Sequence, residues 1–411
     1  MKTATKKDKK FLPYGRQQIN EDDLRAVAKV LKSDWLTQGP TINEFECEIA
    51  EQIGAAEVVA CCNGTAALHL SMMALGVGPG DVVVTSSITF MASANCARFV
   101  GADVVFADID PQTGLMTPEL LEKALRKTPE GKAKAIIPVH FAGQPVDLPG
   151  IFDVADRHGA KIVDDACHAI GASFELDGKV EQVGGNRYSV MSAFSFHPVK
   201  HIAMGEGGAV ATNDGLLAKR LRCLRTHGIQ RERFLNTEMA VAADGQLNPW
   251  YHELQQLGFN YRLSDIHAAL GCSQAKKLRA NVERRNELAS FYRMLLAERF
   301  DEDEVVPLGV RPRVVNAYHL FVVRIDFEKF DVDRATVMNR LREAGIGTQV
   351  HYIPVHLQPY YRQHGGTGPG DFPGAEHYYR QALSIPMYPA LTEEDCTRVV
   401  DELEKALKGS H

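Results

Sequence analysis

Short apolar runs alternate with helical segments along the first half of the chain, and this alternation constrains the fold more than any other feature. Most of the runs are apolar without a two-residue alternation, as in strands of a mostly parallel sheet covered on both faces. We therefore expect an α/β fold whose functional groups gather at the carboxyl ends of the strands. The runs cover residues 58–62, 81–87, 103–109, 134–140, 161–166 and 208–213.

The length of the chain indicates more than one domain, because 411 residues exceed what a single hydrophobic core usually supports. We expect an N-terminal segment (1–20), a large domain (21–270), and a linking helix followed by a small α+β domain (271–408). Gly409, Ser410 and His411 resemble the start of a cloning tag and are left out of the fold prediction. Periodicity predicts helices over residues 21–31, 42–53, 334–343 and 392–407, a long polar helix over 274–300, and a strand over 318–326.

Charge and composition exclude several classes of function. The net charge of −6 gives no basic surface for a nucleic acid, and the basic run from Lys6 to Lys10 is typical of a solvated terminus. Neither a membrane-spanning run nor an apolar signal segment is present in the sequence, so we expect a cytoplasmic protein with no membrane partner. The 8 cysteines show no metal-type spacing, as expected for reduced thiols, and we predict no metal site.

Lys200 and Asp165 are the first candidates for chemistry. Lys200 lies on a predicted loop between an apolar strand and a glycine-rich segment, and a lysine amine can form a Schiff base when burial or nearby cations lower its pKa. Asp165 ends an earlier strand, where an enzyme that uses pyridoxal 5'-phosphate (PLP) needs a carboxylate against the pyridine nitrogen. The alternatives are a surface lysine and a helix cap. His168 either contacts the cofactor O3′ or packs beneath the loop.

A phosphate site is indicated where a predicted strand meets a helix at Asn63, Gly64 and Thr65. Backbone N–H groups at a helix N-terminus bind phosphate, and Gly64 allows a close approach; alternatively, Thr65 simply caps the helix. Ser195 is placed for a further phosphate contact, or is an ordinary strand serine. Phe90 either stacks on the pyridine ring or packs in the core.

Six segments, in this order, carry a resemblance to the DegT-type sugar aminotransferases of PLP fold type I, which are aspartate aminotransferase-like. The resemblance spans nearly the whole chain. WLTQGP and VHYIPVH are further similar to a subgroup of pseudaminic acid biosynthesis, which aminates C4 of a UDP-linked 4-keto-6-deoxy-HexNAc sugar. The six segments are NGTAALHL, ITFMASAN, VDDACHAIGA, FSFHPVKHIAMGEGGAV, GFNYRLSDIHAALG and QVHYIPVHLQPYY.

The resemblance implies PLP as cofactor and a role for each matched residue. Lys200 would be the Schiff-base lysine, Asp165 the partner of the pyridine nitrogen, and His168 the neighbour of O3′. Asp164 stands where the family commonly has Glu, and should face away from the ring. The remaining implied contacts are Phe90 on the ring, and Gly64, Thr65 and Ser195 at the phosphate.

The same resemblance implies partners. Asn260 matches a position that reaches the cofactor phosphate of the neighbouring subunit, so a homodimer with shared sites is implied. His351, Tyr352 and His356 lie in the segment expected to approach the nucleotide sugar, although a core or surface-aromatic role is an equal alternative. Glutamate is the implied amino donor.

The alternatives are a fold-type-I enzyme acting on an amino acid, a different keto-sugar aminotransferase, and a nonenzymatic regulator that keeps the fold. A nicotinamide-binding enzyme is disfavoured because no GxGxxG follows the first strand. The sequence does not identify the nucleotide, the sugar configuration or the carbon that is aminated.

Overall fold

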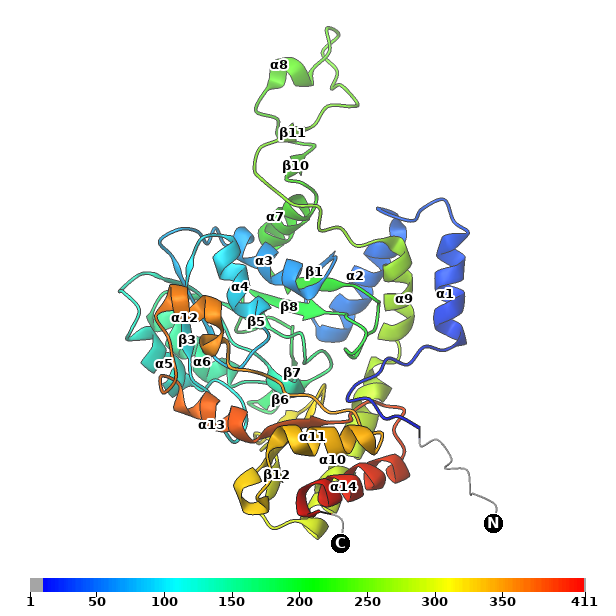
Figure 1. Cartoon of the computed structure of the whole chain (residues 1–411). Helices are drawn as coiled ribbons and strands as arrows, with labels where there is room; N and C mark the ends of the chain where they lie inside the picture. The colour runs from blue at the N-terminus through cyan, green and yellow to red at the C-terminus, as the bar shows by residue number, and fades with distance from the viewer. Residues whose placement is uncertain (1–9, 410–411) are drawn as a thin grey trace.

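A seven-stranded sheet forms the centre of the protein, whose computed structural model describes residues 10–409 (Figure 1). The strand order is β1-β9-β8-β5-β4-β2-β3. Only β9 runs antiparallel to its neighbours, β1 and β8, so the expected α/β class and mostly parallel sheet are confirmed. The bounds are β1 Glu57–Cys61, β2 Val82–Ser86, β3 Asp103–Ala107, β4 Ala133–Ile137, β5 Lys161–Asp165, β8 Met191–Ser195 and β9 Gly208–Thr212.

Helices from the first two-thirds of the chain pack around this sheet. The first begins where periodicity predicts it, because Asn20 and Asp23 form a reciprocal capping box. The second begins at Pro40, slightly before its predicted start, since proline is well suited to a first helical turn. The bounds are α1 Glu21–Leu31, α2 Pro40–Ile53, α3 Gly64–Ala74, α4 Ala92–Phe99, α5 Pro118–Leu125, η1 Phe141–Gly143, α6 Leu148–Arg157, α7 Gly215–Arg225 and α9 Asp265–Ala275.

The C-terminal elements form their own hydrophobic core, which Leu12 of the N-terminal segment joins. The long helix predicted over residues 274–300 is confirmed as α10, but it begins at Leu278 because the preceding helix, α9, ends at Ala275. The domain boundaries stay a prediction. The bounds are α10 Leu278–Arg299, β12 Val305–Pro307, β14 Phe321–Ile325, η2 Phe327–Phe330, α11 Arg334–Glu343, η3 Val355–Leu357, α12 Pro359–Gly365, α13 Pro373–Gln381, β15 Ala382–Ile385 and α14 Glu393–Lys408.

An arm after α7 projects away from the rest of the protein (Figure 1). It carries large exposed apolar side chains, such as Trp250, which is 72% exposed, and Leu257, which is 80% exposed. The sequence did not predict the arm, nor a second small sheet, because their strands are too short to show a period. Their bounds are β10 Ile229–Gln230, α8 Thr237–Ala240 and β11 Glu253–Leu254 in the arm, and β6 Ser173–Leu176, β7 Lys179–Gln182 and β13 Val314–Val315 in the small sheet.

Three strands end at one edge of the central sheet and deliver the candidate residues there. Cys61 and Ser195 both pair with Gly208, the first residue of the antiparallel β9. Asp165 ends β5, which is parallel to β8. Among residues 10–409, no helix is both long and apolar enough to cross a membrane. Lys6 to Lys9, Ser410 and His411 lie outside the described residues, and with them most of the predicted basic run and of the tag-like segment.

Candidate active site

A cavity of about 670 Å³ lies at this edge of the sheet, within the usual size range of a small-ligand site. Most of the predicted site residues line it, whereas Asn260 and His356 do not. Several residues that the sequence analysis did not select also line it, including Tyr14, Glu206 and His319. The predicted residues that line it are Gly64, Thr65, Phe90, Asp165, His168, Ser195, Lys200, His351 and Tyr352.

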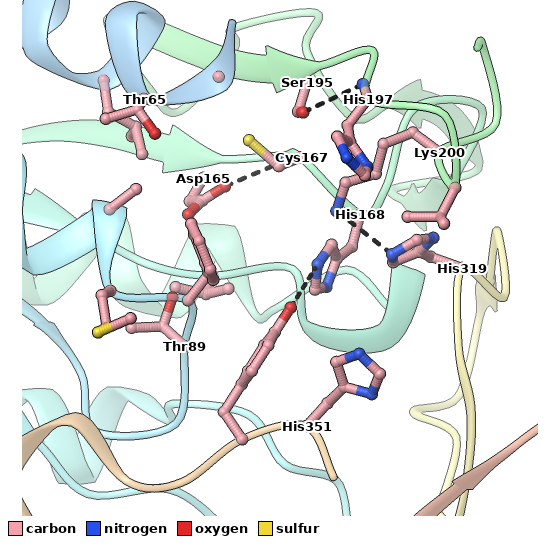
Figure 2. A pocket seen from close by; sticks show the side chains of 18 of the residues that line it. Thr65, Thr89, Asp165, Cys167, His168, Ser195, His197, Lys200, His319 and His351 are labelled. Atoms are coloured by element: carbon pink, nitrogen blue, oxygen red, sulfur yellow. Dashed lines mark hydrogen bonds between the residues drawn. The ribbon is translucent and has the colours of Figure 1, made fainter. Parts of the chain in front are cut away.

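Lys200 extends into the cavity from the loop between β8 and β9 (Figure 2). Its Nζ lies 3.2 Å from Nε2 of His319. Burial lowers the pKa of Lys200 to about 8, although Cys167 and Asp165 oppose this change. A substantial fraction of the amine is therefore neutral just above neutral pH, and a neutral amine is the form that attacks a carbonyl.

Asp165 presents its carboxylate to the cavity from the end of β5. Ser93 Oγ donates a hydrogen bond of 2.6 Å to Oδ2, and the backbone N–H of Cys167 donates to Oδ1 at 3.2 Å. A turn follows Asp165 rather than a helix, so the helix-cap alternative is wrong. Asp164 is buried and accepts hydrogen bonds from Ser189 and Ser192, outside the cavity lining.

The N-terminus of α3 lies beside Ser195. Asn63 caps this helix by accepting a hydrogen bond from the N–H of Ala66, so Thr65 is not the cap. A side chain at Gly64 would have its Cβ 2.8 Å from Cβ of Ser195, which explains the glycine. First-turn N–H groups, together with the Thr65 and Ser195 hydroxyls, offer hydrogen-bond donors for an anion such as a phosphate group.

Aromatic residues form another wall of the cavity. Phe90 is 53% exposed, which excludes the core-packing alternative. Its ring centroid lies 6.2 Å from that of Tyr352, whose hydroxyl is 3.2 Å from Nε2 of His168. Burial lowers the pKa of His168 well below its usual range, so the imidazole is neutral.

The three remaining predicted residues have different surroundings. His351 is buried, lines the cavity and has Nδ1 2.8 Å from Oγ of Ser384. His356 is fully buried outside the cavity, with Nε2 3.3 Å from a Glu376 oxygen, so it does not reach a ligand there. Asn260 is exposed and its backbone pairs with Thr226.

Sequence reasoning missed His319 and Ser93. His319 precedes β14 and looked like part of an ordinary strand. Ser93 lies in α4, and its contact with Asp165 depends on how two distant segments fold together. No local signal could have found either one.

Comparison with known proteins agrees with this geometry. Residues 17–404 match the profile of the DegT/DnrJ/EryC1/StrS aminotransferase family. The chain belongs to this family. It is therefore a PLP-dependent aminotransferase of a family of sugar aminotransferases, and the predicted recognition, cofactor and enzyme class are confirmed.

Individual family members cover almost the whole chain. The spore coat polysaccharide biosynthesis protein SpsC of Bacillus subtilis is 37% identical over 405 residues, which are 97% of this chain and 98% of SpsC. PseC of Helicobacter pylori, an aminotransferase involved in the biosynthesis of pseudoaminic acid, has a TM-score of 0.84 at 28% identity, covering 98% of this chain and 100% of PseC. The PLP form of Spr1654 from Streptococcus pneumoniae has a TM-score of 0.84 at 25% identity, covering 97% and 99% of the two chains.

The residues of the cavity fit PLP. Lys200 offers an amine, Asp165 offers a carboxylate held by Ser93, and the glycine at position 64 leaves space between α3 and Ser195. The carboxylate at the end of β5 and the amine on the loop between β8 and β9 line one cavity. This arrangement suits the aldehyde and the pyridine nitrogen of the cofactor.

Gly64→Ala should lower the affinity for PLP by about tenfold to a hundredfold, because the new Cβ forces α3 away from Ser195. Gly215→Ala is the matched control, since Gly215 also begins a helix after a capping residue but has no atom within 4 Å of an added Cβ. Absorbance titration of the apoenzymes measures both affinities. Equal affinities for the two variants would contradict the placement of the phosphate.

Lys200→Met should stabilise the apoenzyme at pH 7 by about 3 kcal/mol, because the folded protein disfavours the lysine's proton relative to the unfolded chain. The wild type carries this penalty in full below a pH of about 8. It loses this penalty as the pH rises toward the ordinary lysine pKa of about 10.4. The free energies of unfolding of the wild type and the variant should therefore converge at high pH. Urea unfolding at several pH values measures the difference, with Lys161→Met at the opposite, exposed end of β5 as control. A difference that is independent of pH would contradict this explanation.

Proposed function

We propose that this enzyme transfers an amino group from glutamate to C4 of a UDP-linked 4-keto-6-deoxy sugar, in surface-glycan or nonulosonic acid biosynthesis. The convergence of Lys200 and Asp165 on one cavity carries the proposal, because both are needed for transamination with PLP. The relationship to SpsC and PseC supports a sugar substrate of this kind. The 8 unpaired cysteines support a reducing, cytoplasmic location.

Each residue has a defined task in this proposal. Bound PLP supplies an aldehyde that joins the lysine amine and a ring that accepts electrons. Lys200 would hold the cofactor through its amine. Once released, it would move a proton from Cα of the amino donor to C4′ of the cofactor. Asp165 keeps the pyridine nitrogen protonated. His168 would contact O3′ of the cofactor, and Phe90 would pack against its ring.

The opposite wall of the cavity is proposed to receive the sugar. His351 and Tyr352 line it, and both present polar atoms to a largely enclosed space. His356 acts on this wall only indirectly, because it bonds to Glu376 away from the cavity. We propose that residues 354–358 position His351 and Tyr352, which precede them in the chain and line the cavity.

A reaction that uses a cysteine nucleophile is disfavoured. Cys167 lines the cavity, but burial raises the pKa of its thiol well above the usual range, and Asp165 adds to the effect. The thiol is therefore protonated near neutral pH and is a poor nucleophile. This observation disfavours desulfuration among the amino-acid reactions of the same fold.

The purified enzyme with PLP and glutamate should aminate a UDP-linked 4-keto-6-deoxy sugar, and Lys200→Ala should abolish turnover because no second amine replaces it. Mass spectrometry of the nucleotide-sugar products measures the reaction across a panel that varies the nucleotide and the position of the keto group. Lys161→Ala is the control and should retain full activity. Preference for another nucleotide or carbon would overturn the detailed assignment, whereas turnover by Lys200→Ala would overturn the assignment of the lysine.

We further propose a homodimer in which Asn260 of one subunit contacts the cofactor phosphate bound by the other. Lys200 is the only Lys or Arg among the described lining residues, although a nucleotide diphosphate and glutamate both carry negative charge. The exposed apolar arm and Asn260 lie outside the cavity of their own chain. A second subunit would cover the arm and could supply the missing cations, such as Arg231 and Arg233 of the arm.

Mixing Lys200→Ala chains with Asn260→Ala chains should restore activity above the sum of the two separate proteins. A mixed dimer contains one site with an intact Lys200 and an intact Asn260 from the partner. After random exchange of subunits, about a quarter of the wild-type activity should return. The assay requires chains mixed during refolding, with gel filtration to confirm dimers. Lack of restoration in a confirmed mixed dimer would reject the shared site but leave the aminotransferase assignment intact.

A further inference from the structure

The Lys200 amine lies in a cavity where a positive charge has little access to water. A buried ammonium group needs hydrogen-bond acceptors to offset the loss of solvation. Among the described residues, the hydrogen-bond partner found for Nζ is Nε2 of His319, at 3.2 Å. Figure 2 shows this contact on the side of Lys200 opposite to Ser195. Nε2 of His319 is therefore placed to accept a hydrogen bond from the protonated form of Lys200.

The backbone that carries His319 is strained and closely held. Tyr318 has a φ of +48°, which is unfavourable for an aromatic residue. Its N–H donates a 2.7 Å hydrogen bond to Oδ1 of Asn316, and its carbonyl accepts one of 2.9 Å from Arg285. Gly143 lies against the same turn, where a Cβ would be 2.9 Å from the N–H nitrogen of His319. These contacts hold the backbone of the turn from which the imidazole reaches Lys200.

The imidazole of His319 packs against that of His168, with ring centroids 4.4 Å apart, but its hydrogen bonding is incomplete. His319 is 5% exposed, and its Nδ1 has no hydrogen-bond partner among the described residues. A buried histidine retained only for packing would be expected to satisfy both nitrogens or to be replaced by an apolar residue. The contact with Lys200 is thus the main polar interaction of this side chain.

The groups around Lys200 leave His319 uncharged. Burial lowers the pKa of His319 well below its usual range, and the positive charge of Lys200 lowers it further. A neutral imidazole has one nitrogen that accepts a hydrogen bond, whereas a charged one has none. The other titratable groups that interact with Lys200 are Asp165, Cys167, His168, His201 and His351.

We propose that His319 is a positioning residue for Lys200: its neutral Nε2 accepts a hydrogen bond from the ammonium form and so stabilises the lysine while it carries the proton taken from the donor carbon. No atom is gained or lost by His319, which stays neutral while the proton moves to Lys200 and away again. The inference rests on the proposed role of Lys200 as the cofactor-binding lysine. It assigns to His319 a function that no local sequence pattern indicates.

The test measures the pKa of Lys200 in the full-length apoenzyme. Acetic anhydride labels neutral amines, and peptide mass spectrometry gives the extent of Lys200 labelling at each pH. His319→Leu removes the acceptor, so the acid dissociation constant of Lys200 should rise by about tenfold to a hundredfold, which lowers its pKa by one to two units. His319→Gln should keep a value close to the wild type, because its carbonyl oxygen reaches a similar position.

Kinetics provide a second readout on the PLP-loaded enzyme. His319→Leu should lower kcat by about tenfold or more with little change in KM for glutamate, because the proton-carrying state of Lys200 is lost rather than donor binding. His319→Gln should recover most of kcat. His319→Asn should lower kcat as His319→Leu does, since the asparagine side chain is polar but too short to reach Nζ of Lys200.

Circular dichroism and gel filtration establish which variants are folded. A folded Leu or Asn variant with the wild-type labelling profile would overturn the proposal, and so would a folded Gln variant that shifts as far as Leu. If neither the Leu nor the Asn variant folds, the Gln variant alone tests the proposal. It should keep both the wild-type pKa of Lys200 and most of kcat, and loss of either would overturn the proposal. The labelling of Lys200 does not depend on turnover. An unchanged labelling profile would therefore reject the role of His319 alone, whereas activity retained by Lys200→Ala would reject the proposed function.

Discussion

The burial of the Lys200 amine close to the Asp165 carboxylate is the interaction on which the rest of the site depends. A lysine in water stays protonated near neutral pH, and only burial brings its pKa to about 8. The same burial would make the ammonium form costly if nothing compensated it. The Asp165 carboxylate favours the charged form, and His319 offers an acceptor. The site therefore holds both protonation states of the amine within reach, as acid–base chemistry requires.

The central sheet makes this proximity possible between residues far apart in the sequence. The ends of β1, β5 and β8 meet at one edge, because these strands run in the same direction around the antiparallel β9. Each strand end contributes one kind of group: the N-terminus of α3, the Asp165 carboxylate, and the loop that carries Lys200. Rigid strands fix the relative positions of these groups, whereas the segment with His351 and Tyr352 closes the cavity from the C-terminal part of the chain.

The sequence predicted those parts of the fold that leave a local pattern. Apolar runs gave the strands of the central sheet within a few residues, and caps and periodicity gave α1 and α11. Lys200, Asp165 and Gly64 could be predicted because each is a residue type with a clear use in the site. Each also lies at the end of a predicted strand or shortly after it. Ser93 and His319 could not be found, since each acts through a partner more than 70 residues away. The arm was missed because β10 and β11 are too short to show a period. The direction of the His356 side chain, away from the cavity and toward Glu376, depends on a tertiary contact that leaves no local pattern.

The charge of the cavity lining supports the proposal that a second chain completes this site. The described lining contains Lys200 as its one Lys or Arg side chain, and the carboxylates of Asp165 and Glu206 oppose it. A cofactor phosphate can be held by backbone N–H groups and hydroxyls without a cation. A nucleotide diphosphate together with a dicarboxylate donor is harder to accommodate, because each added charge loses solvation on entering the cavity. Since the arm exposes both apolar residues and arginines beyond the sheet edge, selectivity for the nucleotide sugar would depend on residues of two chains. Substrate preference would then follow from the arm and the segment around Tyr352, while the chemistry at Lys200 stays the same.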